Sequence, residues 1–335
     1  MTDGPMTGSL YEADRLVTTM TEERPDGRLS PDEAFAALGD EVRVRILRAL
    51  GDAAEPLAFS ELYDRLPVDD TARFNYHLGE LRGHFVRKTA DGYALDHPGR
   101  RVVEAIRSGA VTDDPELERT PVDDRCPTCE RPLEIQWRDG SVEVFCSACE
   151  SRWDRSWGRV GGPEETESGY LGRLPFPPAG LRGRTPSEVL RAAHAWTNLE
   201  LLAVGSGICP RCAASVDSEL EACSDHERDG VCSNCRSRFA VLLKASCPNC
   251  PYKIGCAAGL GLLSSPELLA FVLDHGMDLF SPGSVLRLDR FLNEYDETVR
   301  STDPLRVTLT FSADGDELAL TVDGNGDVVE DSTER

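Results

Sequence analysis

The first third of the chain carries apolar residues at the three- and four-residue spacing of amphipathic helices. The stretch SPDE at 30–33 is a capping box and predicts a helix whose apolar face holds Phe35 and Leu38. Asp40 is the expected cap of a second helix, and residues 60–66 predict a short third one. The expected buried positions of the second helix are Val42, Ile46, Leu47 and Leu50.

A fourth helix and a hairpin follow. Asp70 is the expected cap of this helix, and Phe74, Leu78 and Leu81 recur at helical spacing along one of its faces. The stretch HFVRKTADGYAL has two short strands around Ala-Asp-Gly, which indicates a hairpin turn. A last helix is centred on VVEAI. These elements predict a winged helix-turn-helix domain over residues 30–109.

Two stretches of this domain, DEAFAALGDEVRVRILRAL and FNYHLGELRGHFV, resemble the ArsR-type winged-helix regulators. In those proteins a His-Leu-x-x-Leu stretch lies on the helix that reads DNA. The resemblance covers about residues 31–108 and implies DNA binding. It does not imply metal sensing by that family's usual sites, because SELYDRL has no thiol, and Asp96 and His97 precede the predicted last helix, within which no histidine follows.

The solvent side of the fourth helix offers candidate DNA contacts. Arginine and asparagine side chains make bidentate contacts with guanine and adenine edges, and basic side chains contact phosphates. Residues 71–101 hold six bases and three acids, so this stretch is locally basic, although ordinary solvated charges would look the same. The expected contacts are Arg73, Asn75 and Tyr76 on the helix, with Arg82, Arg87 and Lys88 at phosphates and in the minor groove.

The chain as a whole is strongly acidic. Its 59 acidic and 36 basic residues give a formal net charge of −23, and only three of the bases are lysine. This balance resembles the proteins of halophilic archaea; an ordinary acidic protein with GC-biased codons is the alternative. Such a chain is not a general polyanion binder, so any nucleic-acid surface has to be local.

No targeting or membrane segment is expected. The N-terminus lacks the basic start and apolar core of a signal peptide, and the most apolar run, from Cys256, is broken by Pro266 and Glu267. The predicted location is therefore the cytoplasm, where thiols stay reduced. Ten of the twelve cysteines fall in Cys-x-x-Cys pairs, so metal binding is the first interpretation.

The first two Cys-x-x-Cys pairs are joined by a predicted hairpin. Sixteen residues, including LEIQWRDGSVEVF with Asp-Gly at its turn, separate Cys126 and Cys129 from Cys146 and Cys149. A hairpin that joins two such pairs brings four thiolates into a tetrahedron, the zinc-ribbon arrangement, expected over residues 125–157. Iron in a rubredoxin-like site is the chemical alternative, whereas a redox dithiol would need only one pair.

Eight further candidate ligands lie in the segment 206–258. They are Cys209, Cys212, Cys223, His226, Cys232, Cys235, Cys247 and Cys250. Two strand-like segments of similar length, 213–222 and 236–246, favour a nested grouping when they pair antiparallel. The outer pairs then form a second ribbon, and the inner pairs form a site of three cysteines and one histidine at the hairpin tip. Cys256 is left over and is expected to be buried.

The remaining segments complete a predicted α+β multidomain fold, with zinc-ribbon hairpins and interspersed helices after the winged helix. Thr185 starts a capped helix expected to bury Val189, Leu190, Ala193, Trp196 and Leu199. RVTLTFSADGDELALTVDG alternates with period two and predicts a C-terminal β-hairpin. The other expected segments are a disordered tail (1–29), an acidic linker (110–124), a connector with a helix (158–205), and a helix with the C-terminal hairpin (259–330).

The portion from 126 to 330 resembles a domain of unknown function that is attached to winged-helix regulators in halophilic archaea. The resemblance rests on the first Cys-x-x-Cys pairs, LPFPPAG, the second ribbon, SPELLAFVLDHGMDL and the final hairpin. It implies no known activity, and the inserted site with His226 is present in only some members.

The leading hypothesis is a DNA-binding transcriptional regulator that acts as a homodimer on double-stranded DNA. Its C-terminal region, with three structural zinc ions, would serve dimerisation, a protein partner or a small-molecule effector, without membrane contact. An enzyme is not expected, because four ligands are available at every predicted metal site. The competing hypothesis is a protein-interaction module whose ribbons contact the transcription machinery without reading DNA sequence.

Overall fold

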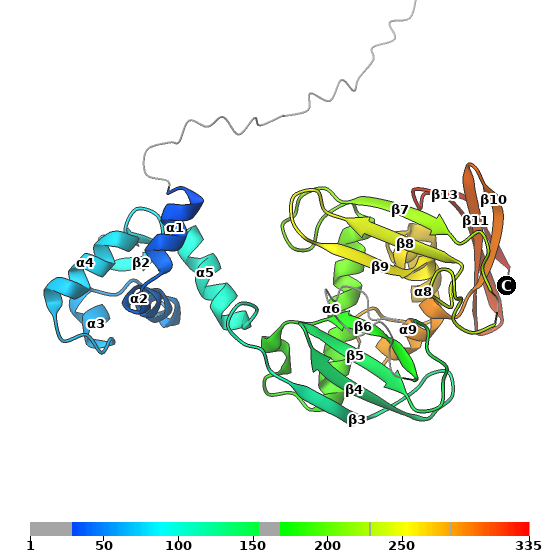
Figure 1. Ribbon diagram of the computed structural model, residues 1–335, viewed down its shortest axis with the longest axis horizontal. Helices are drawn as coiled ribbons and strands as arrows, with labels where there is room; N and C mark the ends of the chain where they lie inside the picture. Colours follow the sequence, from blue (N-terminus) through cyan, green and yellow to red (C-terminus); the bar gives the residue numbers. More distant parts are fainter. Residues whose placement is uncertain (1–28, 154–167, 228, 282, 335) are drawn as a thin grey trace, which may run out of the picture. The chain divides into compact units, whose positions relative to one another are not determined.

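The computed structural model describes residues 29–153, 168–227, 229–281 and 283–334, and its fold is α+β with small antiparallel sheets (Figure 1). The chain divides into two compact units, the first ending at Glu104 and the second running from Ala105. The expected disordered tail lies outside the described residues, apart from Leu29. None of the helices in the described part of the chain has the length and apolar character needed to cross a membrane.

The first unit contains four helices, a short hairpin and most of a fifth helix. These are α1 (Pro31–Leu38), α2 (Glu41–Asp52), α3 (Phe59–Asp64), α4 (Thr71–Leu81), β1 (Val86–Lys88), β2 (Tyr93–Leu95) and α5 (His97–Ser108). The predicted caps are confirmed: Ser30 and Glu33 form a capping box, and Asp40 and Asp70 accept backbone N–H groups at the starts of α2 and α4. β1 and β2 pair antiparallel as expected.

One apolar cluster forms the core of this unit. The expected positions of α2 and α4 are all buried, with 8% exposure or less. The prediction for α1 is wrong at Phe35, which is 74% exposed, while Ala37 is buried and Ala34 and Leu38 pack against the cluster. The inward face of α1 runs through its alanines, because residues three and four apart share a helical face.

The second unit begins with a four-stranded antiparallel sheet in the order β3-β4-β5-β6. Its strands are β3 (Leu117–Arg125), β4 (Pro132–Arg138), β5 (Ser141–Cys146) and β6 (Tyr170–Pro175). The predicted hairpin is confirmed as β4–β5, and Asp139 and Gly140 at its turn both have positive φ, as Asp-Gly turns favour. The expected acidic linker is wrong in its second half, because β3 pairs with β4 and buries Val122.

A short helix η1 (Pro178–Leu181) and the long helix α6 (Pro186–Gly205) follow the sheet. The capping box at Thr185 is confirmed. Val189, Leu190 and Ala193 are buried as predicted, but Trp196 and Leu199 are 39% and 49% exposed, which corrects the prediction for this helix. The buried face includes His194 and Asn198 instead, because distant segments supply polar partners: Asn198 Nδ2 donates to the Leu279 carbonyl at 2.8 Å.

The rest of the second unit contains two sheets separated by helices. The three-stranded sheet has the order β7 (Asp217–Ala222), β8 (Val241–Ser246) and β9 (Lys253–Ala257). The four-stranded sheet has the order β10 (Asp296–Thr302), β11 (Leu305–Ala313), β12 (Asp316–Asp323) and β13 (Val328–Glu334). Between them lie α7 (Ala258–Gly261), η2 (Leu262–Ser264), α8 (Pro266–Asp274) and α9 (Val285–Asn293). The predicted C-terminal hairpin is β11–β12, and β9, β10 and β13 extend the predicted hairpins into sheets.

Helix α6 joins the apolar clusters of the second unit (Figure 1). Its N-terminal half packs on the first sheet, and its C-terminal half contributes Leu201 and Val204 to a larger cluster with α8, α9 and β11–β12. A small third cluster brings Trp153 against Phe239 at a ring separation of 5.7 Å, connecting the first sheet to the segment before β8.

Candidate metal centres and nucleic-acid interface

The structure brings the twelve predicted ligands into three groups of four. Within each group the ligand atoms all lie within 4.8 Å of one another. The nested grouping of the eight later ligands is confirmed, since the pairs at the base of the β7–β8 hairpin meet each other and the pairs at its tip do the same. The groups are Cys126, Cys129, Cys146 and Cys149; Cys209, Cys212, Cys247 and Cys250; and Cys223, His226, Cys232 and Cys235.

The distances within each group fit a four-coordinate metal ion. Sγ–Sγ separations are 3.6 Å for Cys126 and Cys149, 3.4 Å for Cys129 and Cys146, and 3.6 Å for Cys209 and Cys250. Four sulfurs at about 2.3 Å from a central ion would lie about 3.8 Å apart, whereas a disulfide bond is about 2.05 Å long. Tetrahedral sites rich in thiolate suit zinc and, for four sulfurs, iron.

The backbone at one Cys-x-x-Cys pair of each group forms the same turn. Glu130, Ala213 and Arg236, each directly after the second cysteine of a pair, have φ values of 59°, 61° and 63°. In each turn the N–H of this residue donates to the carbonyl of the pair's first cysteine at 2.8 to 2.9 Å. The same left-handed turn therefore presents two thiols in one direction at all three groups.

The close packing of thiols in each group favours the binding of a cation. Burial, and then the neighbouring thiols of Cys129 and Cys126, raise the pKa of Cys149 far above that of an ordinary thiol. A hydrogen bond from Asn249 lowers the pKa of Cys212 to about 6. Thiolates packed this closely repel one another, and a divalent ion at their centre would remove that repulsion and stabilise the hairpin ends.

The histidine at the tip belongs to a closed group. His226 Nδ1 lies 3.4 Å from Cys235 Sγ. The neighbouring Glu227 carboxylate accepts the Ser233 backbone N–H at 2.8 Å and its hydroxyl at 3.1 Å, and these bonds lower the pKa of Glu227. Glu227 thus stabilises the turn that carries Cys232. Four protein ligands are available in this group, which is the number that structural zinc sites use.

The predicted DNA contacts all lie on the surface of the first unit. Arg73, Asn75, Tyr76, Arg82, Arg87 and Lys88 are exposed. Within the described residues, Arg73, Arg82 and Lys88 form no ion pair, whereas Arg87 lies 3.5 Å from Asp96. Lys88 Nζ lies 6.0 Å from the centre of the Tyr93 ring.

Aromatic contacts hold α4 in its orientation. The fully buried ring of Phe74 packs edge-on against two rings of α3, Phe59 at 5.1 Å and Tyr63 at 5.3 Å. His77, on the same face, is buried, with its Nδ1 3.6 Å from Asp40 Oδ1. The inward face is therefore fixed by packing, which leaves Arg73, Asn75 and Tyr76 outside.

Sequence reasoning missed a group of polar residues in the second unit. His194, Arg152 and Asp289 come from three separate segments and line one cavity there. No sequence motif links these three residues. The one signal in the sequence is that α6 has polar residues, such as His194 and Asn198, at positions that helical spacing places on its buried face.

Two family models match the chain. Residues 123–328 match a domain of unknown function, DUF7351, and residues 31–106 match a second domain of unknown function, DUF7347. No curated protein and no solved structure matches the chain. The interval between the two matched regions includes the end of α5 and the start of β3.

Proposed function

The chain belongs to the family described as a domain of unknown function, DUF7351, and we propose that it is a sequence-specific DNA-binding transcriptional regulator. In this proposal the first unit is a winged helix-turn-helix of the ArsR type, in which α4 reads the major groove and the β1–β2 hairpin is the wing. The second unit is the effector, partner-binding or dimerisation region, built on zinc-ribbon hairpins.

The observation that supports the proposal best is the division of α4 into two faces. Phe74, Leu78 and Leu81 are buried in the core, whereas Arg73 and Asn75 are exposed. These exposed side chains are the types that make bidentate contacts with guanine and adenine edges. They lie in residues 71–101, a stretch where bases outnumber acids six to three, in a chain with a net charge of −23.

The acidic composition, which is typical of proteins from salt-rich cells, bears on how the proposed interface would gain its affinity for DNA. In a cell rich in salt, near 1 M, the screening length is only about 3 Å, so attraction between basic side chains and phosphates is weak. Base-edge contacts by Arg73 and Asn75 and apolar packing then have to supply more of the affinity. Tyr76, 60% exposed beside them, offers such an apolar surface.

Zinc is the proposed ion at all three groups. Two groups have four cysteines and the third has three cysteines and one histidine, both of which are common structural zinc sets. Zinc would hold the ends of the hairpins and supply no chemistry. The expected content is three zinc ions per chain.

The regulator is proposed to act as a homodimer on double-stranded DNA. Two copies of α4 would then read half-sites about 34–36 Å apart, one helical turn of DNA. A genome-wide map of binding sites in cells would identify the operator and show whether it has this twofold symmetry.

The decisive experiment is the double substitution Arg73→Ala with Asn75→Ala in the full-length protein. Each bidentate base contact contributes about 1–3 kcal/mol, so affinity for the mapped site should fall by about 30-fold or more. The matched control is Arg48→Ala, which removes an exposed arginine of α2 and should leave affinity unchanged.

Both variants should retain their metal content and melting temperature, because all three side chains are exposed. If the double variant binds the same promoter with unchanged affinity, the regulator proposal fails. The outcome would then favour the protein-interaction module.

A further inference from the structure

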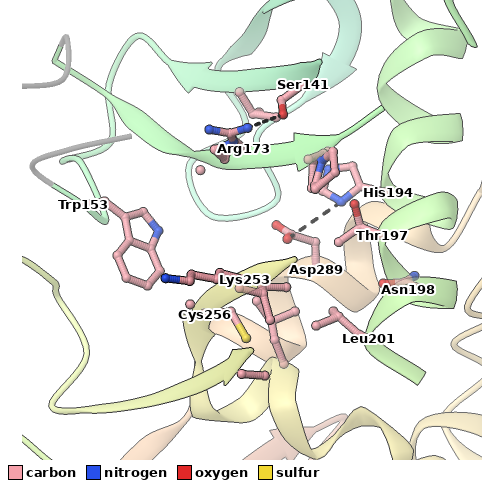
Figure 2. Close-up of a pocket in the computed structure, with 18 of the residues that line it drawn as sticks. Ser141, Trp153, Arg173, His194, Thr197, Asn198, Leu201, Lys253, Cys256 and Asp289 are labelled. Carbon is pink, nitrogen blue, oxygen red and sulfur yellow. Dashed lines mark hydrogen bonds and ion pairs between the residues drawn. The ribbon is translucent and has the colours of Figure 1, made fainter. Parts of the chain in front are cut away.

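The second unit contains a cavity of about 1470 Å³, and every residue that lines it belongs to this unit. Small-molecule sites commonly have volumes of about 300–1,000 Å³, so this cavity has room for an organic ligand together with water. Figure 2 shows that residues reach it from α6, from β5–β6 of the first sheet and, on the opposite side, from β9. The labelled side chains include His194 and Thr197 from α6, Ser141 and Arg173 from the first sheet, and Lys253 from β9.

Part of the cavity wall is apolar. Tyr170 and Leu201 are almost fully buried and line it, and Trp153 and Ile254 add an indole ring and a branched aliphatic side chain. These four residues come from β6, α6, the segment after the first metal group, and β9. An apolar ligand body would therefore be enclosed from several directions.

The charged residues of the wall are mostly basic. Five basic and three acidic residues line the cavity, although acids outnumber bases 59 to 36 in the whole chain. Two of the three lysines in the sequence, Lys244 and Lys253, are among the five. Lys244 pairs with Glu221, whereas Lys253 forms no ion pair within the described part of the chain. Arg211 likewise pairs with Glu200, so the attraction of the cavity for an anion depends mainly on Lys253 and Arg152.

A buried arginine strengthens this preference. Arg152 is 6% exposed, and among the described residues its one side-chain partner is Asp289, with Nη1 3.4 Å from Oδ2. That carboxylate is shared, because Asn293 Nδ2 also donates to Asp289 at 3.1 Å. A guanidinium has five N–H donors, so a single long contact leaves most of the donor capacity of Arg152 available to a ligand.

Two hydroxyl groups beside the cavity also lack partners. Thr197 Oγ1 and Tyr252 Oη are buried atoms with no hydrogen-bond partner among the described residues, and both residues line the cavity. Buried polar groups are almost always hydrogen-bonded in native proteins. A ligand with acceptor oxygens would satisfy both of them.

We propose that this cavity binds a small amphipathic organic anion, a carboxylate carried on an apolar body. The carboxylate would lie among Lys253, Arg152 and the hydroxyl of Thr197, and the apolar body would pack against Trp153, Tyr170 and Leu201. The site is independent of the proposed DNA contacts, because every one of its residues belongs to the second unit.

Binding, and not catalysis, is the expected role of the cavity. Cys256 lines it, but burial raises the pKa of this thiol to about 12, so it stays protonated and is a poor nucleophile. Burial lowers the pKa of His194, and its nearest acidic atom, Asp289 Oδ1, is 3.9 Å from Nδ1. The neutral imidazole is suited to hydrogen-bond a ligand oxygen.

Calorimetry on the full-length, metal-loaded protein tests the proposal with decanoate as the probe. Decanol and decylamine are controls with the same chain length, and inorganic phosphate is a control for anion binding alone. Decanoate should bind once per chain and more tightly than the other three. Equal binding of decanoate and decanol, tighter binding of decylamine or phosphate, or no saturable binding of decanoate would overturn the proposal.

Variants then locate the site. Lys253→Gln removes an exposed charge and should weaken decanoate binding on the order of tenfold or more, the usual effect of losing a charged hydrogen bond. Thr197→Val preserves shape and should weaken it by a smaller factor. Lys88→Gln, at the only lysine outside the cavity wall, is the matched control and should leave it unchanged.

If Lys253→Gln binds decanoate as tightly as the parent protein, the proposed site is wrong. These measurements contain no DNA, so their outcome does not depend on the result of the Arg73→Ala and Asn75→Ala experiment.

Discussion

The two units are stabilised in different ways. The first unit contains no cysteine, and one apolar cluster takes buried residues from each of its helices and both strands of its hairpin. The second unit divides its buried apolar residues among three clusters and contains all twelve cysteines of the chain. The ends of the hairpins β4–β5 and β7–β8 carry the three cysteine-rich groups that could hold metal ions. Ions bound there would crosslink the hairpin ends and add to the stability of the second unit.

Metal removal is expected to affect the two units most differently. Stripping the ions from the full-length protein should unfold the hairpins β4–β5 and β7–β8 of the second unit and leave the first unit intact, because a structural zinc contributes about 10–16 kcal/mol of binding free energy. Hydrogen exchange measured by mass spectrometry would show loss of protection in β4–β5 and β7–β8 only. Elemental analysis before stripping should find three zinc ions per chain.

Two outcomes would contradict this expectation. One is a second unit that keeps its protection after the ions are gone, and the other is a first unit that loses protection together with it.

A substitution in the apolar core of the first unit should destabilise that unit and leave the second unit unchanged. Phe74 is fully buried and contacts two aromatic rings, so Phe74→Ala should reduce the stability of the first unit by about 3–5 kcal/mol. The second unit should retain its metal and its amide protection. Denaturant unfolding followed by hydrogen exchange separates the two units. Tyr76→Ala is the matched control, since this aromatic ring on the same helix is exposed and its loss should change stability little.

A smaller effect is expected from pH. Burial lowers the pKa of His194 in the folded state, while Asp289 partly opposes this shift. Below the ordinary pKa of about 6.5 the unfolded chain binds the proton more readily than the folded chain, so the free energy of unfolding of the second unit should fall as pH drops. His194→Gln should reduce this slope, measured as the change in melting temperature between pH 7.5 and 5.5 with excess zinc. A slope as steep in the variant as in the parent would show that His194 is not its source.

Removing either of the two capping boxes should change the free energy of unfolding least. Ser30 Oγ accepts the Glu33 N–H at 3.3 Å at the start of α1, and Thr185 Oγ1 accepts the Glu188 N–H at 3.4 Å at the start of α6. Ser30→Ala and Thr185→Ala should each cost about 1 kcal/mol. Each variant should lower the melting temperature of its own unit only. A change of the same size in both units would mean that they unfold together.

The three candidate metal-binding groups show how much of the site could be predicted from the sequence. Cys-x-x-Cys pairs at the ends of predicted strands leave few ways to arrange four ligands, and antiparallel pairing of the segments around β7 and β8 selects one grouping. The prediction depended on local spacing and on one hairpin, so it needed no knowledge of the distant packing. The same holds for the caps at Ser30, Asp70 and Thr185 and for the turn at Asp139 and Gly140.

The errors share a different cause. Phe35, Trp196 and Leu199 are large and apolar, and helical spacing together with this character predicts each of them on a buried face, although all three are exposed. Their exposure depends on which neighbouring segments cover a helix, and helical spacing by itself does not specify this. β3 was missed because its sequence is dominated by charged residues, although pairing with β4 requires only its backbone and Val122 packs beneath it.

The caps, the hairpins and the grouping of the twelve candidate metal ligands follow from the amino-acid sequence, since they depend on residues close together in the chain or joined by one hairpin. The cavity of the second unit follows from the packing of distant segments. It places Arg152, His194 and Asp289 together from three distant segments. Polar side chains such as these are buried only where remote partners compensate the loss of water, and such partners are a property of the packed molecule.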